Sequence, residues 1–337
     1  MSVAAGALAA ALAAATAWGA PPAAGAKPAV RGAPPSAPAV PAGAPLRFAP
    51  KARKMSTYTL NGRFEIKTRD VSFEAPDAYI DGFNFCAGRM KGNKRSEVYQ
   101  TVTMTQDVDG SGLLPFRRTI PRFNLELEKQ GQVFASSDAI ERNVTRLVWE
   151  GTLDPFGNLK EKRMVGGKDN PEIAQLALSE IDRIFPVVQG ARDIKIGEGF
   201  KEESIVALPT KLNIAGLEDV TLKVTRDYTL KSVASGLATF DVILTYSSDP
   251  GYKPKAESTA CAFSGGGAGD AVFEVKRGVF VRSRVPSSLR IDIEAPLRPL
   301  PGHPETDVAA VGKSHIDLDL VLFGEQRVAR TWGEEED

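Results

Sequence analysis

The sequence predicts a mainly β fold: a two-halved curved antiparallel sheet, a half-barrel or a sandwich, with one central covering helix. Three observations support this prediction. Apolar and polar residues alternate with a period of two in many segments between residues 56 and 328, turn residues separate these segments, and one segment has helical periodicity. The 337 residues, 42% of them hydrophobic, are enough for one large core.

The alternation places apolar side chains on one face of each predicted strand and polar side chains on the other. It is clearest in nine segments, at 64–67, 98–105, 123–128, 222–225, 240–246, 272–275, 279–281, 290–294 and 316–322. Turn residues separate the segments at 109–110, 154–158, 249–251, 265–267 and 277–278. We therefore expect a long meander of half-buried strands.

One segment, 171–185, breaks this pattern and predicts a helix. Pro171 suits the first helical position, and Pro186 ends the helix. The apolar residues recur at spacings of three and four, so one face must be buried against the sheet. The residues of this face that we expect to line a ligand pocket are Ile173, Leu176, Ile181 and Ile184, although plain core packing is the more common role of such a face.

The chain divides into four parts by composition. Residues 1–26 hold an Ala-rich apolar run and predict a signal peptide cleaved between 19 and 26, with a low-complexity tail as the alternative. Residues 27–55 predict a disordered Pro/Ala-rich linker, 56–328 the β-rich domain and 329–337 an acidic tail. We expect a periplasmic or secreted location, with no transmembrane segment in the mature chain.

The charge pattern excludes one class of partner. Basic and acidic residues number 42 each, so no overall charge attracts nucleic acid. Seven basic and no acidic residues precede Glu65, which makes the N-terminal segment positive. This segment either contacts an anionic surface or serves as a solvated spacer.

The two cysteines lie one in each half of the chain. In an exported protein Cys86 and Cys261 predict one disulfide, and closing so long a loop contributes about 4–5 kcal/mol. Two buried free thiols are the alternative. Because only two His accompany them, the chain has little material for a transition-metal site, and we expect no cofactor and no metal.

Two motifs contain residue types that carry chemistry. Residues 107–112 match the first half of a calcium loop, but Arg118 stands where the last ligand should be Glu, and a hairpin turn explains the same residues. His315, Asp317 and Asp319 alternate with apolar residues, so they share one strand face at about 7 Å spacing. They suit a divalent ion or a hydrolase, or else a solvated face that protects a sheet edge.

Three other features have structural explanations. His303 lies in a Pro-rich loop and is interpreted as solvated. The glycines of 265–269 lack the Lys-Ser/Thr that follows in a phosphate loop, so they predict a flexible hairpin. The basic clusters 89–95 and 116–122 lack interleaved stacking aromatics and predict solvated loops, with no nucleic-acid platform.

The signal-like start, the spacer and the strand–helix–strand layout resemble those of uncharacterised exported bacterial β-rich proteins. They are distantly similar to periplasmic lipoprotein carriers, which are half-barrels covered by helices. The short stretches that carry the resemblance are 194–200, 265–269, 273–275 and Gly278, and it covers residues 56–328. It implies an apolar concavity that holds lipid acyl chains.

We therefore expect an exported, non-enzymatic envelope protein. Its expected task is to bind a hydrophobic ligand between sheet and helix, or an envelope protein along a sheet edge. The alternatives are a structural or assembly component of the cell envelope and a hydrolase that uses His315 with Asp317 or Asp319.

Overall fold

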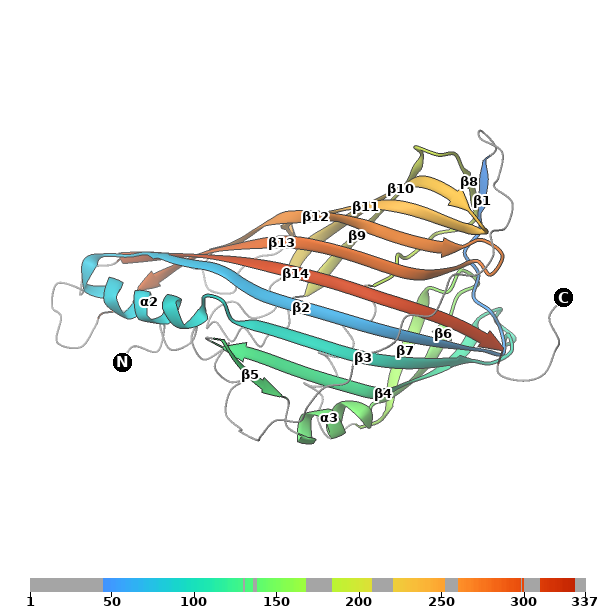
Figure 1. The fold of residues 1–337 in the computed structure, drawn as a ribbon, viewed down its shortest axis with the longest axis horizontal. Coiled ribbons are helices and arrows are strands. Elements are labelled where there is room, and N and C mark those ends of the chain that lie inside the picture. Colours follow the sequence, from blue (N-terminus) through green and yellow to red (C-terminus); the bar gives the residue numbers. More distant parts are fainter. Residues whose placement is uncertain are drawn as a thin grey trace.

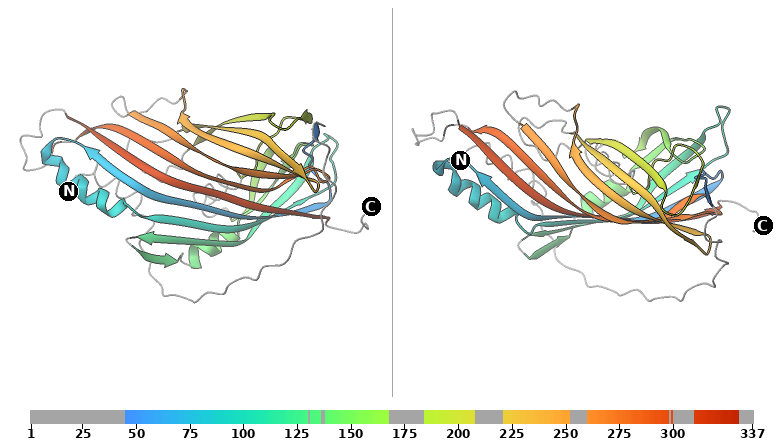
Figure 2. Two further views of the ribbon diagram at one scale, coloured as in Figure 1. Left: turned by 45° about the horizontal axis from the view of Figure 1, so that its top comes forward. Right: turned by 90° about the horizontal axis from the view of Figure 1, so that it is seen from above.

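The computed structural model of the chain describes residues 45–129, 131–135, 138–167, 184–207, 221–251, 260–297, 299 and 310–330. In this part of the chain, twelve antiparallel strands form one sheet, and two short strands form a second. The large sheet is bent into a trough whose two edges curl toward the same side (Figures 1 and 2). The prediction of a mainly β, curved antiparallel sheet is confirmed.

The elements have the following bounds in chain order: β1 Leu46–Phe48, β2 Ser56–Glu74, α2 Asp77–Met90, β3 Lys94–Thr105, β4 Leu114–Lys129, β5 Gln132–Ala135, α3 Asp138–Thr145, β6 Val148–Leu153, β7 Leu159–Gly166, β8 Arg192–Ile194, β9 Gly199–Ala207, β10 Thr221–Ala234, β11 Leu237–Ser248, β12 Ala260–Glu274, β13 Val279–Leu297 and β14 Ala310–Arg330.

The sheet has two halves, each built largely from neighbours in sequence. Strands β7, β6, β4, β3 and β2 form the first half in that order, and β5 pairs with β4. Strands β14, β13, β12, β11, β10 and β9 form the second. Because β2 pairs with β14 along nearly its whole length, the two halves are one continuous sheet and share one inner face.

A bulge in the β2–β14 pairing keeps apolar side chains inward along both long strands. Phe64 lies opposite Leu322, and Val71 lies opposite Ile316, although 64 and 71 differ in parity. The register shift beside Asp317 inserts one extra residue in β2 and restores the phase. The inner face of the trough therefore stays apolar from end to end.

The core lies on this inner face in two large clusters. The larger cluster lies under the second half of the sheet. The other lies under the first half and includes Ile184, which comes from outside the sheet. The largest fully buried side chains are those of Trp149, Phe48, Phe240, Phe273 and Ile120.

Phe48 is the central side chain of the larger cluster. It belongs to β1, which pairs with β8 to form the two-stranded sheet at one end of the trough (Figure 1). Its ring is fully buried and lies 4.7–6.0 Å, between centroids, from four other aromatic rings, those of Phe200, Phe240, Phe273 and Phe280. Residues 45–55, the last part of the predicted linker, are therefore folded, because they supply this aromatic anchor.

The prediction of a flexible hairpin at residues 265–269 is wrong. These residues lie inside β12, with β11 on one side and β13 on the other. A Cβ at Gly267 would stand 2.1 Å from the Pro286 carbonyl oxygen, so only glycine permits this close approach of the strands. Tyr246 reaches across the glycines, and its hydroxyl lies 3.1 Å from the Ser287 Oγ. Glycines inside strands allow the sheet to curve.

The structure also contains two helices that the sequence analysis did not predict. Helix α2 packs beside β2 and buries Tyr79 and Met90, and α3 packs on β4 through Val144. The predicted helix at 171–185 lies almost entirely outside the described residues. Its last two residues, Ile184 and Phe185, form a bend.

We predict that Phe48→Ala lowers the free energy of unfolding by about 3–5 kcal/mol, because it leaves a cavity among four aromatic rings. Phe85→Ala is the matched control, since Phe85 is 65% exposed on α2 and should cost less than about 0.5 kcal/mol. Urea denaturation of both variants measures the difference. Equal stability of the two variants would show that β1 is not part of the core.

Candidate functional site

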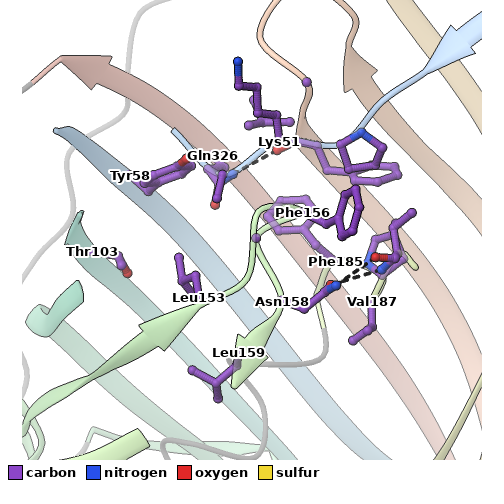
Figure 3. A pocket seen from close by; sticks show the side chains of 18 of the residues that line it. Lys51, Tyr58, Thr103, Leu153, Phe156, Asn158, Leu159, Phe185, Val187 and Gln326 are labelled. Carbon is purple, nitrogen blue, oxygen red and sulfur yellow. Dashed lines mark hydrogen bonds between the residues drawn. The ribbon is translucent and has the colours of Figure 1, made fainter. Parts of the chain in front are cut away.

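A pocket of about 280 Å³ lies on the inner face, at the end of the trough that β1 and β8 cross (Figure 3). Strands β2, β3, β4, β6, β7, β13 and β14 contribute to its lining, and three connecting segments cover it: residues 50–52, 156–158 and 185–188. Its described lining is mainly apolar and comprises Pro50, Lys51, Ala52, Tyr58, Leu60, Thr101, Thr103, Arg118, Leu153, Phe156, Gly157, Asn158, Leu159, Phe185, Pro186, Val187, Val188, Gly278, Val279, Phe280 and Gln326.

Three polar residues form a row across the floor of this pocket. Tyr58 of β2 lies opposite Thr103 of β3, which lies opposite Arg118 of β4. The Arg118 Nε donates a hydrogen bond to the Thr103 Oγ1 at 2.9 Å. Because all three share one face of adjacent strands, the row places a phenol, a hydroxyl and a guanidinium side by side.

Tyr58 remains a hydrogen-bond donor at neutral pH. Its oxygen accepts a hydrogen bond from the backbone N–H of Arg53 at 2.7 Å. Burial raises the pKa of Tyr58 above its usual value of 10.0, despite the opposing effect of this bond and of the Arg53 charge. The phenol therefore keeps its proton, which it can donate to a ligand.

The turn between β6 and β7 holds one covering segment in place. The Asn158 side chain donates to the Val188 carbonyl at 2.8 Å and accepts from the Val188 N–H at 3.1 Å (Figure 3). Asp154 shapes the turn, since its Oδ1 accepts from the backbone N–H groups of Phe156 and Asn158 at 2.9 Å each. Segment 184–188 is thus fastened to the turn by side-chain bonds that mimic a β pair.

The segment that follows β1 closes the pocket from another side. The Lys51 N–H donates to the Gly278 carbonyl and the Ala52 N–H to the Pro155 carbonyl, both at 2.8 Å. Gly278 belongs to the β12–β13 turn and Pro155 to the β6–β7 turn, so this segment bridges the two halves of the sheet. The N-terminal strand that anchors the core therefore also forms a pocket wall.

A buried ion pair lies beside segment 184–188. Glu202 and Arg226 face each other across β9 and β10, with Oε2 and Nη1 3.6 Å apart and both side chains 10% exposed. Burial raises the pKa of Glu202, although Arg226 and a hydrogen bond from the Val187 backbone oppose this effect. The pair therefore links β9 to segment 184–188.

The structure places only one of the four predicted ligand-binding residues. Ile184 is 2% exposed and packs against the backbone of Gly324, so it belongs to the core and does not line the pocket. Its neighbour Phe185 does line the pocket. The other three, Ile173, Leu176 and Ile181, lie outside the described residues.

The structure confirms that His315, Asp317 and Asp319 share one face of a strand, the outer face of β14. It does not join them, because His315 contacts Asp292, with Nδ1 and Oδ1 2.5 Å apart, while Asp317 and Asp319 contact Arg69. The interpretation that these three residues protect an edge of the sheet is wrong. Strand β14 lies in the middle of the sheet, so these residues cover a solvated face.

The other predicted features have mixed outcomes. Residues 106–113 connect β3 to β4 as a hairpin, in which the Asp109 Oδ1 accepts from Ser111 and Leu113 backbone N–H groups. The Cys261 side chain is half-buried, and burial together with the nearby Asp292 raises the pKa of its thiol to about 12. The Cys86 side chain lies outside the described residues, as does His303, so the disulfide stays a prediction.

Arg118 is the pocket residue that the sequence analysis misplaced. Cluster 116–122 was expected in a solvated loop, but it lies within β4, and Arg118 points to the inner face. The available signal was its phase, because Arg118 alternates in step with the apolar residues Leu114, Phe116 and Ile120. Its guanidinium lies 5.4 Å from the centre of the Phe116 ring, a cation–π distance.

The contribution of Asp292 to the stability of the fold should depend on pH. Burial by itself would raise the pKa of Asp292, but hydrogen bonds from His315 and Arg290 outweigh it and hold the pKa below its usual 3.8. Such a group stabilises the fold above pH 3.8, and this contribution disappears as the pH falls through the lower folded value.

We therefore predict that Asp292→Asn lowers the urea midpoint at pH 7, and that this loss becomes smaller as the pH falls below 3.8 and the wild-type carboxylate takes up a proton. Urea denaturation of both proteins across this range measures the effect. A loss that stays constant down to the lowest pH at which the wild-type protein is folded would contradict a role for the ionised carboxylate.

No protein family and no curated protein matches the sequence. Among solved structures, the outer membrane protein OprG of Pseudomonas aeruginosa shares 8% identity over 83% of this chain and 99% of its own, with a TM-score of 0.22. Pseudomonas aeruginosa OccK5 (OpdH) shares 5% over 82% and 100%, with a TM-score of 0.17. The secretin-domain β-barrel of InvG from the Salmonella SPI-1 injectisome shares 8% over 84% and 65%, with a TM-score of 0.13. Scores this low support no conclusion about function.

In the described ranges, neither helix has the length and apolar character needed to span a membrane.

Proposed function

We propose that this protein is an exported, non-enzymatic binding protein of the cell envelope that holds a small amphiphilic ligand in the covered pocket of the trough. The observation that carries the proposal is the pocket itself. It combines a mainly apolar lining with a row of hydrogen-bonding groups on one side of the floor. Ligand sites usually have this composition, and about 280 Å³ suits a ligand at the small end of their range.

The construction of the pocket supports binding over a passive packing defect. Three separate covering segments converge on it, and two of them are fastened by hydrogen bonds to Gly278, Pro155 and Asn158. A preformed, covered cavity loses little conformational entropy when a ligand enters. The exported location rests on the apolar N-terminal run of residues 1–26.

The hydrolase alternative receives less support from the geometry. His315 lies on the outer face of the sheet, between the carboxylates of Asp292 and Glu74. A general base needs a nucleophile within hydrogen-bond reach, and both of these contacts are carboxylates. In the proposed function, His315 is part of the charged outer surface and has no catalytic role.

The test uses a neutral apolar fluorophore, N-phenyl-1-naphthylamine, titrated into the delipidated full-length protein. We predict saturable binding at one site, weakened roughly tenfold or more by Val187→Trp, because the indole of this variant would occupy the pocket. Val133→Trp is the matched control, since Val133 is exposed on β5 and lies outside the pocket lining. Native mass spectrometry before and after organic extraction would detect a co-purifying ligand.

Two results would overturn the proposal. The first is the absence of saturable fluorophore binding by the wild-type protein. The second is equal binding by the Val187→Trp and Val133→Trp variants, which would place the binding site elsewhere.

A further inference from the structure

Tyr58 offers the pocket a hydrogen-bond donor. Its oxygen accepts from the Arg53 backbone N–H at 2.7 Å, and this bond leaves the phenolic proton available. Among the residues that the structure describes, none accepts this proton. Tyr58 is half-buried and lines a mainly apolar pocket, where polar groups usually have a partner. The unused donor therefore indicates a place for an acceptor atom of a ligand.

The polar side chains that line the pocket next to Tyr58 are uncharged. Thr103 lies directly opposite Tyr58 in β3. Gln326 of β14 lies opposite Leu60, which is two residues along β2 and on the same face as Tyr58. The Gln326 Nε2 donates to the Phe280 carbonyl at 3.1 Å, which holds the amide in place (Figure 3). This part of the pocket is thus polar without being charged.

The cationic side chains near the pocket are already bound to protein or lie in solvent. Arg118 donates to the Thr103 Oγ1 at 2.9 Å and lies over the Phe116 ring. Lys51 is exposed on the segment that bridges the two halves of the sheet. The Arg53 charge acts on the Tyr58 phenol, but Arg53 is not among the lining residues. The described cations therefore give no buried site for an anionic head group.

Two buried carboxylates lie beside the pocket, and both are bound to protein groups. The Asp154 Oδ1 accepts from two backbone N–H groups of its turn, and its Oδ2 lies 3.5 Å from the Lys160 Nζ. Glu202 lies 3.6 Å from Arg226. A charged ligand group, of either sign, would lose its hydration here without meeting an unpaired buried charge of the opposite sign. The surroundings therefore favour an uncharged ligand.

The apolar part of the lining lies on other elements. Leu153 and Leu159 come from β6 and β7, Phe156 from the turn between them, and Phe185 and Val187 from the covering segment (Figure 3). These side chains suit a hydrocarbon or aromatic body. The pocket thus combines one neutral polar corner with apolar walls.

We propose that the ligand is an uncharged amphiphile whose head-group oxygen accepts a hydrogen bond from the Tyr58 hydroxyl. This inference rests on the proposed function, because it specifies the ligand class of the same pocket. Carbonyl and hydroxyl head groups share the required acceptor oxygen, and the experiment below separates them.

The test measures displacement of N-phenyl-1-naphthylamine by four aromatic compounds of the same size. Acetophenone carries a carbonyl group, 1-phenylethanol a hydroxyl group, benzoate a negative charge, and cumene no polar atom. We predict that the wild-type protein binds acetophenone or 1-phenylethanol about tenfold or more tightly than benzoate, because only the anion must give up strong hydration.

A variant that removes only the phenolic oxygen assigns the bond. Tyr58→Phe should weaken binding of the preferred oxygen compound by about threefold to tenfold, the range of one neutral hydrogen bond, and leave cumene within about twofold. The compound that loses more affinity identifies the head group. Tyr246→Phe is the matched control, since its hydroxyl contacts Ser287 outside the pocket lining, and it should leave all four affinities unchanged.

A second measurement needs no variant, because Tyr58→Phe also removes the acceptor of the Arg53 N–H and could fail to fold. Infrared spectroscopy of isotope-labelled acetophenone bound to the wild-type protein reports on its carbonyl group. The stretching frequency should be lower than in hexane, as for a carbonyl that accepts a hydrogen bond. A frequency equal to that in hexane would contradict the inference.

The outcomes separate the two proposals. If the wild-type protein binds the fluorophore but Tyr58→Phe weakens cumene as much as the oxygen compounds, or weakens none, the head-group inference is wrong and the proposed function stands. Tighter binding of benzoate than of both neutral oxygen compounds would also overturn the inference. If the wild-type protein binds neither the fluorophore nor any of the four compounds, the proposed function itself fails.

Discussion

The insertion of Phe48 into the trough is the contact on which the rest of the structure depends. A bent sheet with an apolar inner face must cover that face, and β1 does so at one end by placing a single aromatic ring among four others. The residues that follow are then held across the gap between the β12–β13 and β6–β7 turns. The same segment therefore completes the core and forms a wall of the pocket.

Curvature is the second requirement, and the strands meet it through glycine and tyrosine pairs. In β12 the glycines of 265–269 let neighbouring backbones approach, and Tyr246 lies across them. In the first half, a Cβ at Gly62 would stand 2.2 Å from the ring of Tyr99. Each half of the sheet thus contains glycines at which neighbouring groups approach more closely than a Cβ would allow, and both edges curl to one side (Figure 2).

Much of the fold could be predicted from the alternation of residue types. The period of two identifies the strands because each strand has one buried and one solvated face. The same rule, applied strictly, would have placed Arg118 inside, since it is in phase with Phe116 and Ile120. When residues 116–122 are taken together as one basic cluster they predict a solvated loop, but Arg117 and Arg118 point to opposite faces of β4.

Other features depend on contacts that are distant in sequence. Helix α2 contains Gly82 and Gly88, which lower its intrinsic helix propensity, and it forms by packing Met90 and Ala87 on the sheet. The glycine run of β12 is typical of a turn in isolation, and only its pairing with β11 and β13 makes it a strand. The role of Phe48 depends on four aromatic residues at least 150 positions away, which local composition does not show.

The central claim is that the segment containing β1 is an integral part of the fold and of the pocket wall. Hydrogen–deuterium exchange of the full-length protein tests it directly, by comparing peptides from residues 45–53 with peptides from β14 at the centre of the sheet. Slow exchange in both, over minutes to hours, is the predicted result, because the N–H groups of the first segment pair with β8, Gly278 and Pro155. Exchange of residues 45–53 at the rate of an unstructured peptide would contradict the account.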